Sequence, residues 1–102
     1  MRQFDVYPNP NASMRSVAPF VVILSSHYLP ELTEVVVAPL FATRKTTLQG
    51  TEVRVVVDDA DLLVVLSGLA AVRSGSLRRR LGNLLAHEDD IRRALDRLFT
   101  GF

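Results

Sequence analysis

The stretch EDDIRRALDRLFTG, residues 88–101, lies next to the C-terminal residue Phe102 and decides the fold class. Its apolar residues recur three and four positions apart, which places them on one stripe of an α-helix. The members of this stripe are Ile91, Ala94, Leu95, Leu98 and Phe99. Acidic residues at 88–90 favour the positive end of the helix dipole, and Gly101 stands where helices commonly end. The stretch therefore predicts a C-terminal amphipathic helix.

The residues before this helix have the alternation or the β-branched clusters of strands. We expect strands at 3–7, 20–24, 35–38, 52–57 and 62–66, with a further short one at 69–72. Residues 58–61 predict a four-residue hairpin connection, and Pro39 is expected to end the third strand. Leucines between 77 and 85 hint at one more helical turn. Strands first and a helix last predict a β-rich α+β fold, an antiparallel sheet with one C-terminal α-helix.

Composition indicates one globular domain spanning residues 1–102, because 48% of the residues are apolar and 23% are charged. The chain contains no cysteine, so disulfides and thiolate metal sites are excluded. The first residues lack the apolar run of a secretory signal, and no apolar run approaches the roughly 18 residues that cross a bilayer. We expect a cytoplasmic protein that makes no membrane contact.

The charges of the chain nearly cancel, with twelve basic and eleven acidic residues and a net charge of +1. This balance argues against direct binding of nucleic acid, which requires many phosphates to be neutralised. The run of arginines at 78–80 is the exception, and it predicts either phosphate contacts or, with more weight, a solvated edge.

Residue types typical of catalysis and metal binding do not occur in useful patterns. The acidic stretch 58–61 lacks the loop glycine and distal glutamate of a calcium loop, and it is interpreted as a solvated turn. His27 follows two serines but has no evident acid to orient it. We therefore expect no catalytic residue, no metal and no cofactor, and a protein that acts by binding and is not an enzyme.

Three segments carry a family resemblance: QFDVY at 3–7, VVAPL at 36–40, and the stretch from Asp90 to Phe102. Together they resemble the CcdB toxins of type II toxin–antitoxin systems. The resemblance implies a symmetric homodimer with an SH3-like antiparallel β core, like that of Kid and MazF, and one C-terminal helix in each protomer. It also implies poisoning of DNA gyrase through the gyrase A protein, and neutralisation by a CcdA-like antitoxin with a flexible C-terminal segment.

The same resemblance implies which residues meet these partners. The gyrase-binding positions carried over from the family are Phe99, Thr100, Gly101 and Phe102, with Asp96, His27 and Tyr28 at the same surface. Thr100 stands where the family has tryptophan, so gyrase poisoning is expected to be weak. The arginines Arg78, Arg79 and Arg80 are expected to attract an acidic antitoxin peptide.

Two alternatives stay open beside a gyrase poison. One is a ribonuclease toxin of the related MazF and Kid fold, which requires a basic groove and an acid/base pair across it. The other is a CcdB-like protein that binds its antitoxin but has lost gyrase poisoning. In each case residues 35–37, apolar on both faces, lead us to expect a homodimer.

Overall fold

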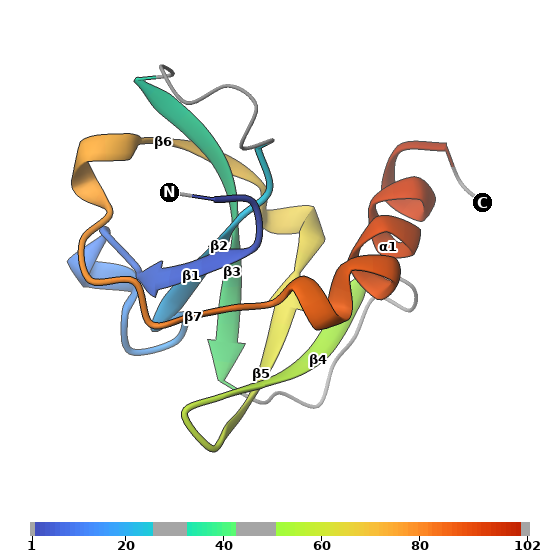
Figure 1. Ribbon diagram of the computed structural model, residues 1–102, viewed down its shortest axis with the longest axis horizontal. Coiled ribbons are helices and arrows are strands. Elements are labelled where there is room, and N and C mark those ends of the chain that lie inside the picture. The colour runs from blue at the N-terminus through green and yellow to red at the C-terminus, as the bar shows by residue number, and fades with distance from the viewer. Residues whose placement is uncertain (1, 26–32, 43–50, 101–102) are drawn as a thin grey trace.

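A curled antiparallel sheet forms the body of the protein in the computed structural model, which describes residues 2–25, 33–42 and 51–100 (Figure 1). Its strands are β1 (Asp5–Pro8), β2 (Phe20–Ile23), β3 (Glu34–Ala42), β4 (Glu52–Val57), β5 (Ala60–Val65), β6 (Ala70–Arg73) and β7 (Gly82–Asn83). They are ordered β4-β5-β3-β2-β1-β7, and β6 pairs with the first half of β3. With α1 (Glu88–Thr100) at the end of the chain, the sheet confirms the expected β-rich fold with one C-terminal helix.

The β4–β5 hairpin follows the predicted alternation but has a tighter turn. Val53, Val55 and Val57 are buried on one face of β4. Asp58 and Asp59 both adopt left-handed backbone conformations, with φ of 50° and 64°. Two such residues form a two-residue hairpin turn, and aspartate tolerates this conformation better than most residues. The predicted four-residue connection is therefore wrong, since β5 already begins at residue 60.

Strand β3 continues through Pro39 to Ala42, so the expected end at Pro39 is also wrong. On one side β3 pairs with two successive partners: Val37 lies opposite Ala70 of β6, and Leu40 lies opposite Val64 of β5. Pro39 falls in the gap between these partners. A residue without an N–H is tolerated there because no strand on that side requires its hydrogen bond.

The segment before the helix is largely extended, and the helical turn expected between 77 and 85 is replaced by β7 and a single 3₁₀ turn, η4 (Leu85–His87). The backbone N–H of Leu81 donates to the carbonyl oxygen of Val6, and that of Leu84 donates to Phe4, both at 2.8 Å. Leu77 and Leu84 are buried. These leucines anchor an edge of the sheet and do not belong to a helical stripe.

Helix α1 covers one face of the sheet through the first part of its stripe. Ile91 and Ala94 are fully or nearly fully buried, and Leu95 and Leu98 pack partly buried against the same core. Phe99 is 69% exposed, so the last member of the stripe extends beyond the sheet. Among the described residues, no helix is long and apolar enough to cross a membrane.

Candidate functional site

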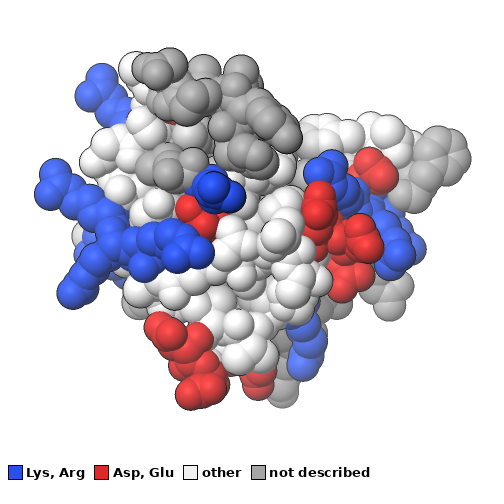
Figure 2. Space-filling model, in the orientation of Figure 1, with Lys and Arg blue, Asp and Glu red and all other residues white. Residues whose placement is uncertain are grey.

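Arginines gather on the segment that leads from β6 through η3 (Ser74–Ser76) to β7. We call residues 73–80 the arginine segment, because Arg73, Arg78, Arg79 and Arg80 all project from it. Figure 2 shows basic side chains along this edge of the molecule, whereas in that view the acidic ones lie mainly at the β4–β5 turn and on the helix. Arg79 has a left-handed φ of 68°, which marks a sharp bend in the exposed backbone.

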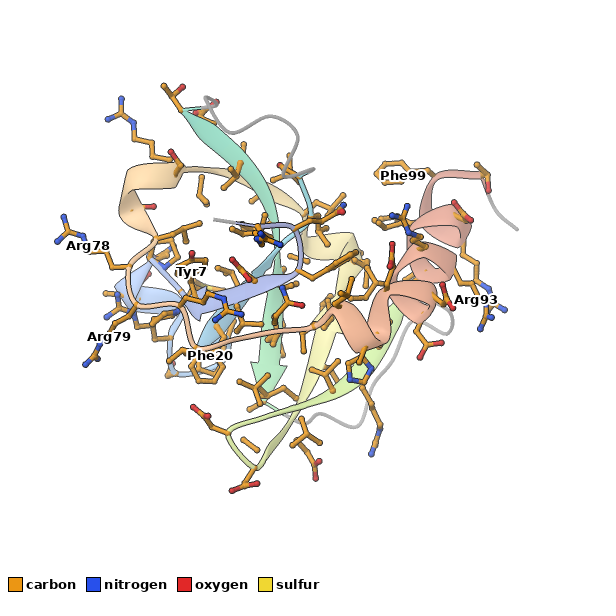
Figure 3. The ribbon with its side chains drawn as sticks, viewed as in Figure 1. Tyr7, Phe20, Arg78, Arg79, Arg93 and Phe99 are labelled. Atoms are coloured by element: carbon orange, nitrogen blue, oxygen red, sulfur yellow. The ribbon has the colours of Figure 1, made fainter. Side chains whose placement is uncertain are left out.

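Three of these arginines are joined to none of the carboxylates that the structure describes. Within the described parts of the chain, Arg73, Arg78 and Arg79 form no ion pair. All three are exposed. In Figure 3 the side chains of Arg78 and Arg79 point away from the body of the protein. The arginine segment is therefore a surface suited to an anionic partner.

The fourth arginine is held by a buried carboxylate from the other end of the chain. Asp5 is only 2% exposed, although it carries a charge. Its carboxylate accepts hydrogen bonds from Nε of Arg80 at 2.8 Å, Nδ2 of Asn83 at 2.9 Å, and the backbone N–H of Arg2 at 2.8 Å. These contacts explain how a charged side chain is tolerated inside the sheet.

The contacts also shift the titration of the groups around Asp5. Burial by itself raises the pKa of Asp5, but the hydrogen bonds from Arg80, Asn83 and Arg2 and the charge of Arg80 outweigh it, so the pKa lies below its ordinary value of 3.8. The hydrogen bond and negative charge of Asp5 raise the pKa of Arg80. Burial and the charge of Asp5 raise the pKa of the nearby Tyr7 hydroxyl, and Arg80 opposes this. At neutral pH the pair is therefore fully charged.

The lowered pKa of Asp5 predicts a specific loss of stability in acid. The ionised carboxylate stabilises the folded state at every pH above its unfolded pKa, and this contribution is lost as the pH falls through the lower folded value. The free energy of unfolding of the wild type should therefore decline more steeply below about pH 4 than that of Asp5→Asn. Urea unfolding at a series of pH values measures the difference, and parallel pH profiles would contradict it.

Beside the arginine segment lies an open hollow of about 710 Å³. Its lining residues are Thr33, Glu34, Arg73, Ser74, Gly75 and Ser76. Glu34 and Arg73 are directly opposite each other in the β3–β6 pair, so both side chains project from the same face of the sheet. In the described part of the chain neither is joined to any ion-pair partner. Among the described residues, the hollow thus combines a carboxylate and a guanidinium that are in no ion pair.

Hydrogen bonds fix the backbone that lines the hollow. The Ser74 N–H donates to the carbonyl oxygen of Thr33 at 2.8 Å, and the Ser74 hydroxyl donates to the same oxygen at 3.2 Å. The Ser76 hydroxyl donates to the carbonyl oxygen of Arg73 at 2.6 Å. These bonds join η3 to the start of β3, so that Glu34 and Arg73 project from a well-defined frame.

The residues expected to bind gyrase lie elsewhere. In Figure 3 Phe99 stands on the helix, across the molecule from Arg78 and Arg79. Thr100 and Asp96 are exposed near it, and the Thr100 hydroxyl donates to the carbonyl oxygen of Asp96. His27, Tyr28, Gly101 and Phe102 are outside the described residues. Of the predicted gyrase-binding residues, those that the structure describes therefore lie on the helix, away from the arginine segment.

Sequence reasoning missed Asp5, Glu34, Arg73 and Asn83 as site residues. One signal was available: Asp5 stands between Phe4 and Val6, and an acidic residue inside a short apolar strand is unusual enough to suggest a buried partner. Asn83 lies 78 residues away from it, and no local pattern connects the two. In the described ranges, no three histidine or acidic side chains come together in a way that could hold a metal ion.

Known proteins share both the sequence pattern and the fold. The family described as "CcdB protein" matches residues 3–101. The Mycobacterium tuberculosis toxin MazF-mt6 is 25% identical, with 96% of each chain covered and a TM-score of 0.74. A structure described as an Mtb toxin is 30% identical over 80% of this chain and 92% of its own, with a TM-score of 0.71.

A third similar structure is an endoribonuclease in complex with its cognate antitoxin, from Mycobacterial species. It is 22% identical, covers 94% of this chain and 91% of its own, and has a TM-score of 0.74. No curated protein sequence matches the chain. The structural neighbours correct one expectation: the prediction of a protein that is not an enzyme is wrong, because the fold neighbours include endoribonucleases.

Proposed function

The chain belongs to the CcdB family of toxins, and from that premise we propose that it acts as an endoribonuclease in a type II toxin–antitoxin system of the cytoplasm. The family expected from the terminal segments is confirmed. The observation that carries the proposal is the hollow in which Glu34 faces Arg73, directly beside the arginine segment. It offers a basic surface, a carboxylate that can act as general base and a guanidinium that can stabilise charge on the phosphate.

The reaction we propose is cleavage by the RNA's own 2′-hydroxyl. Glu34 takes the proton of that hydroxyl, whose oxygen attacks the adjacent phosphorus. The bond from phosphorus to the 5′-oxygen then breaks, and the departing oxygen takes up a proton from water. The hydroxide left behind takes the proton from Glu34, which restores the carboxylate. Arg73 stabilises the negative charge that builds up on the phosphate oxygens. The products are a 2′,3′-cyclic phosphate and a 5′-hydroxyl end.

The arginine segment would hold the strand on either side of the cleaved phosphate. Arginine forms paired hydrogen bonds to phosphate oxygens, and positive charge near a backbone raises affinity without selecting a sequence. Arg78 and Arg79 are exposed and point into solvent, so a single strand can reach them. Which bases are preferred depends on contacts beyond these residues.

The same surface suits an antitoxin, as the complex seen for the endoribonuclease neighbour suggests. An acidic peptide that occupied the arginine segment would compete with RNA directly, because both partners use the same charges. We also propose a homodimer. An apolar hollow of about 340 Å³ on the sheet, lined in part by Met14, Val37 and Phe41, offers a surface that a second copy of the chain could cover.

A second candidate function is binding of the gyrase A protein through the end of the helix. One observation favours it: Phe99 is 69% exposed at the position that the family resemblance assigns to gyrase contact. Exposed aromatic side chains are common anchors of protein interfaces. Thr100 in place of tryptophan removes much of the apolar area that such a contact would bury, so this candidate ranks second.

Two assays on the purified chain separate these functions. Incubation with single-stranded RNA should give fragments that carry a 2′,3′-cyclic phosphate, and addition of the antitoxin encoded beside this gene should stop the reaction. A gyrase cleavage assay should show little trapped DNA complex. Intact RNA together with efficient trapping of the gyrase complex would reject the ribonuclease and favour the second candidate.

A further inference from the structure

The guanidinium of Arg80 is fixed on its inner side and open on its outer side. Nε donates to Oδ1 of Asp5 at 2.8 Å, while the Arg80 side chain is 54% exposed and that of Asp5 only 3%. Arginine has five N–H donors in a rigid plane. Among the described residues the terminal amino groups of Arg80 have no acceptor, so their four N–H groups are available to a ligand.

From this geometry we propose that Arg80 is a phosphate-binding residue for the backbone of single-stranded nucleic acid, and that Asp5 is its positioning residue. The proposal deepens the proposed function, on which it rests for the identity of the substrate. An arginine whose Nε is held by a buried carboxylate presents its two amino groups in a fixed direction. That geometry matches two oxygens of one phosphate.

Asp5 is built to position Arg80. Its carboxylate is itself fixed by Asn83 and by the N–H of Arg2, so it is not free to follow a moving arginine. The contrast is Arg92, whose Nε donates to Glu88 at 2.8 Å in a pair that is exposed on both sides, 58% and 35%. An exposed pair of that kind rearranges readily in water, so Glu88 does not hold the guanidinium of Arg92 in a fixed direction.

The role of Asp5 can be tested by the sign of one effect. Simple electrostatics predicts that Asp5→Asn strengthens nucleic-acid binding, because it removes a negative charge beside a basic surface. Positioning predicts the opposite, because the neutral amide no longer holds the guanidinium in place. A weaker complex in Asp5→Asn therefore cannot be explained by charge alone.

The probe is a fluorescent 2′-deoxy oligonucleotide of about 12 nucleotides. Its phosphates can bind Arg80, but it cannot be cleaved because it lacks the 2′-hydroxyl that attacks the phosphorus. Arg80→Gln should weaken binding about tenfold and lower the slope of log K against log salt by about 0.7. Asp5→Asn should weaken binding by a comparable factor. Arg80→Lys keeps the charge but replaces the planar guanidinium by a single nitrogen that cannot pair with two phosphate oxygens in the same way, so it should also bind more weakly. Arg92→Gln is the matched control and should bind as the wild type does.

Melting temperatures of all variants check the fold. If Asp5→Asn melts below the assay temperature, the affinity of Arg80→Lys tests the proposal instead. This variant is expected to stay folded because the Arg80 side chain lies on the surface. Wild-type affinity in Arg80→Gln and Arg80→Lys, or tighter binding by folded Asp5→Asn, overturns the inference even if the protein cleaves RNA. Weaker binding in these variants by a protein that cleaves no RNA leaves the inference standing and rejects the proposed function. A wild type that binds no oligonucleotide overturns both.

Discussion

Replacing Glu34 by glutamine is expected to slow RNA cleavage by about 10²- to 10⁴-fold, the usual contribution of a general base. The amide has nearly the same shape but cannot take up the proton of the 2′-hydroxyl. Binding should be as tight or tighter, because a negative charge is removed next to Arg73, its cross-strand neighbour. Single-turnover cleavage under saturating protein measures the chemical step, and fluorescence anisotropy measures binding.

Glu88→Gln is the control for this variant. Glu88 is also a partly exposed glutamate near an arginine, but its ion pair with Arg92 lies on the helix, away from the hollow. Its loss costs about 0–1 kcal/mol of stability and should not change the cleavage rate. Cleavage by Glu34→Gln at the wild-type rate would exclude Glu34 as the base, and equal losses in both variants would indicate a general effect of charge.

The elements that the sequence predicted well are those specified by neighbouring residues. The alternation of 52–57 specifies β4, because in a strand every second residue faces the core. The stripe of 88–101 specifies α1, because in a helix the residues three and four positions apart share the buried face. Periodicity also identifies which side of a helix faces the sheet. It does not indicate how far the sheet extends, so the 69% exposure of Phe99 could not be predicted from the stripe alone.

The site was harder to predict because its parts are distant in sequence. Arg80 is 75 residues from Asp5, and Glu34 meets Arg73 only when β6 pairs with β3. Pro39 gave a misleading signal for a similar reason, since its tolerance depends on where two partner strands leave a gap. Local patterns specify local structure, and only the pairing of strands brings these residues together.

Net charge was the least informative quantity for function. A balance of +1 led to the expectation of no direct nucleic-acid contact, whereas the proposed function places RNA on the arginine segment. A net charge near zero is compatible with RNA binding at the arginine segment, because the acidic side chains are concentrated elsewhere, at the β4–β5 turn and on α1 (Figure 2). Binding responds to the charges within about 10 Å of the partner, the screening length at moderate salt, and not to the sum over the chain.

The largest loss of stability is expected from Ile91→Ala. The Ile91 side chain is fully buried where α1 packs on the sheet, within the cluster that also contains Leu66 and Val64. Truncating a buried isoleucine to alanine costs about 2–5 kcal/mol, from lost apolar burial and from the cavity left behind. Since domains of this size are stable by about 5–15 kcal/mol, this is a large share of the total.

Phe99→Ala is the matched helix variant, and the comparison also bears on function. Phe99 lies on the same stripe but is mostly exposed, so its loss should change the free energy of unfolding by no more than about 0.5 kcal/mol. Urea unfolding followed by circular dichroism measures both variants. A larger loss for Phe99→Ala than for Ile91→Ala would contradict the packing of α1 against the sheet. With stability unchanged, any effect of Phe99→Ala on gyrase binding would report on the helix end alone, and unchanged RNA cleavage would assign the two activities to opposite sides of the molecule.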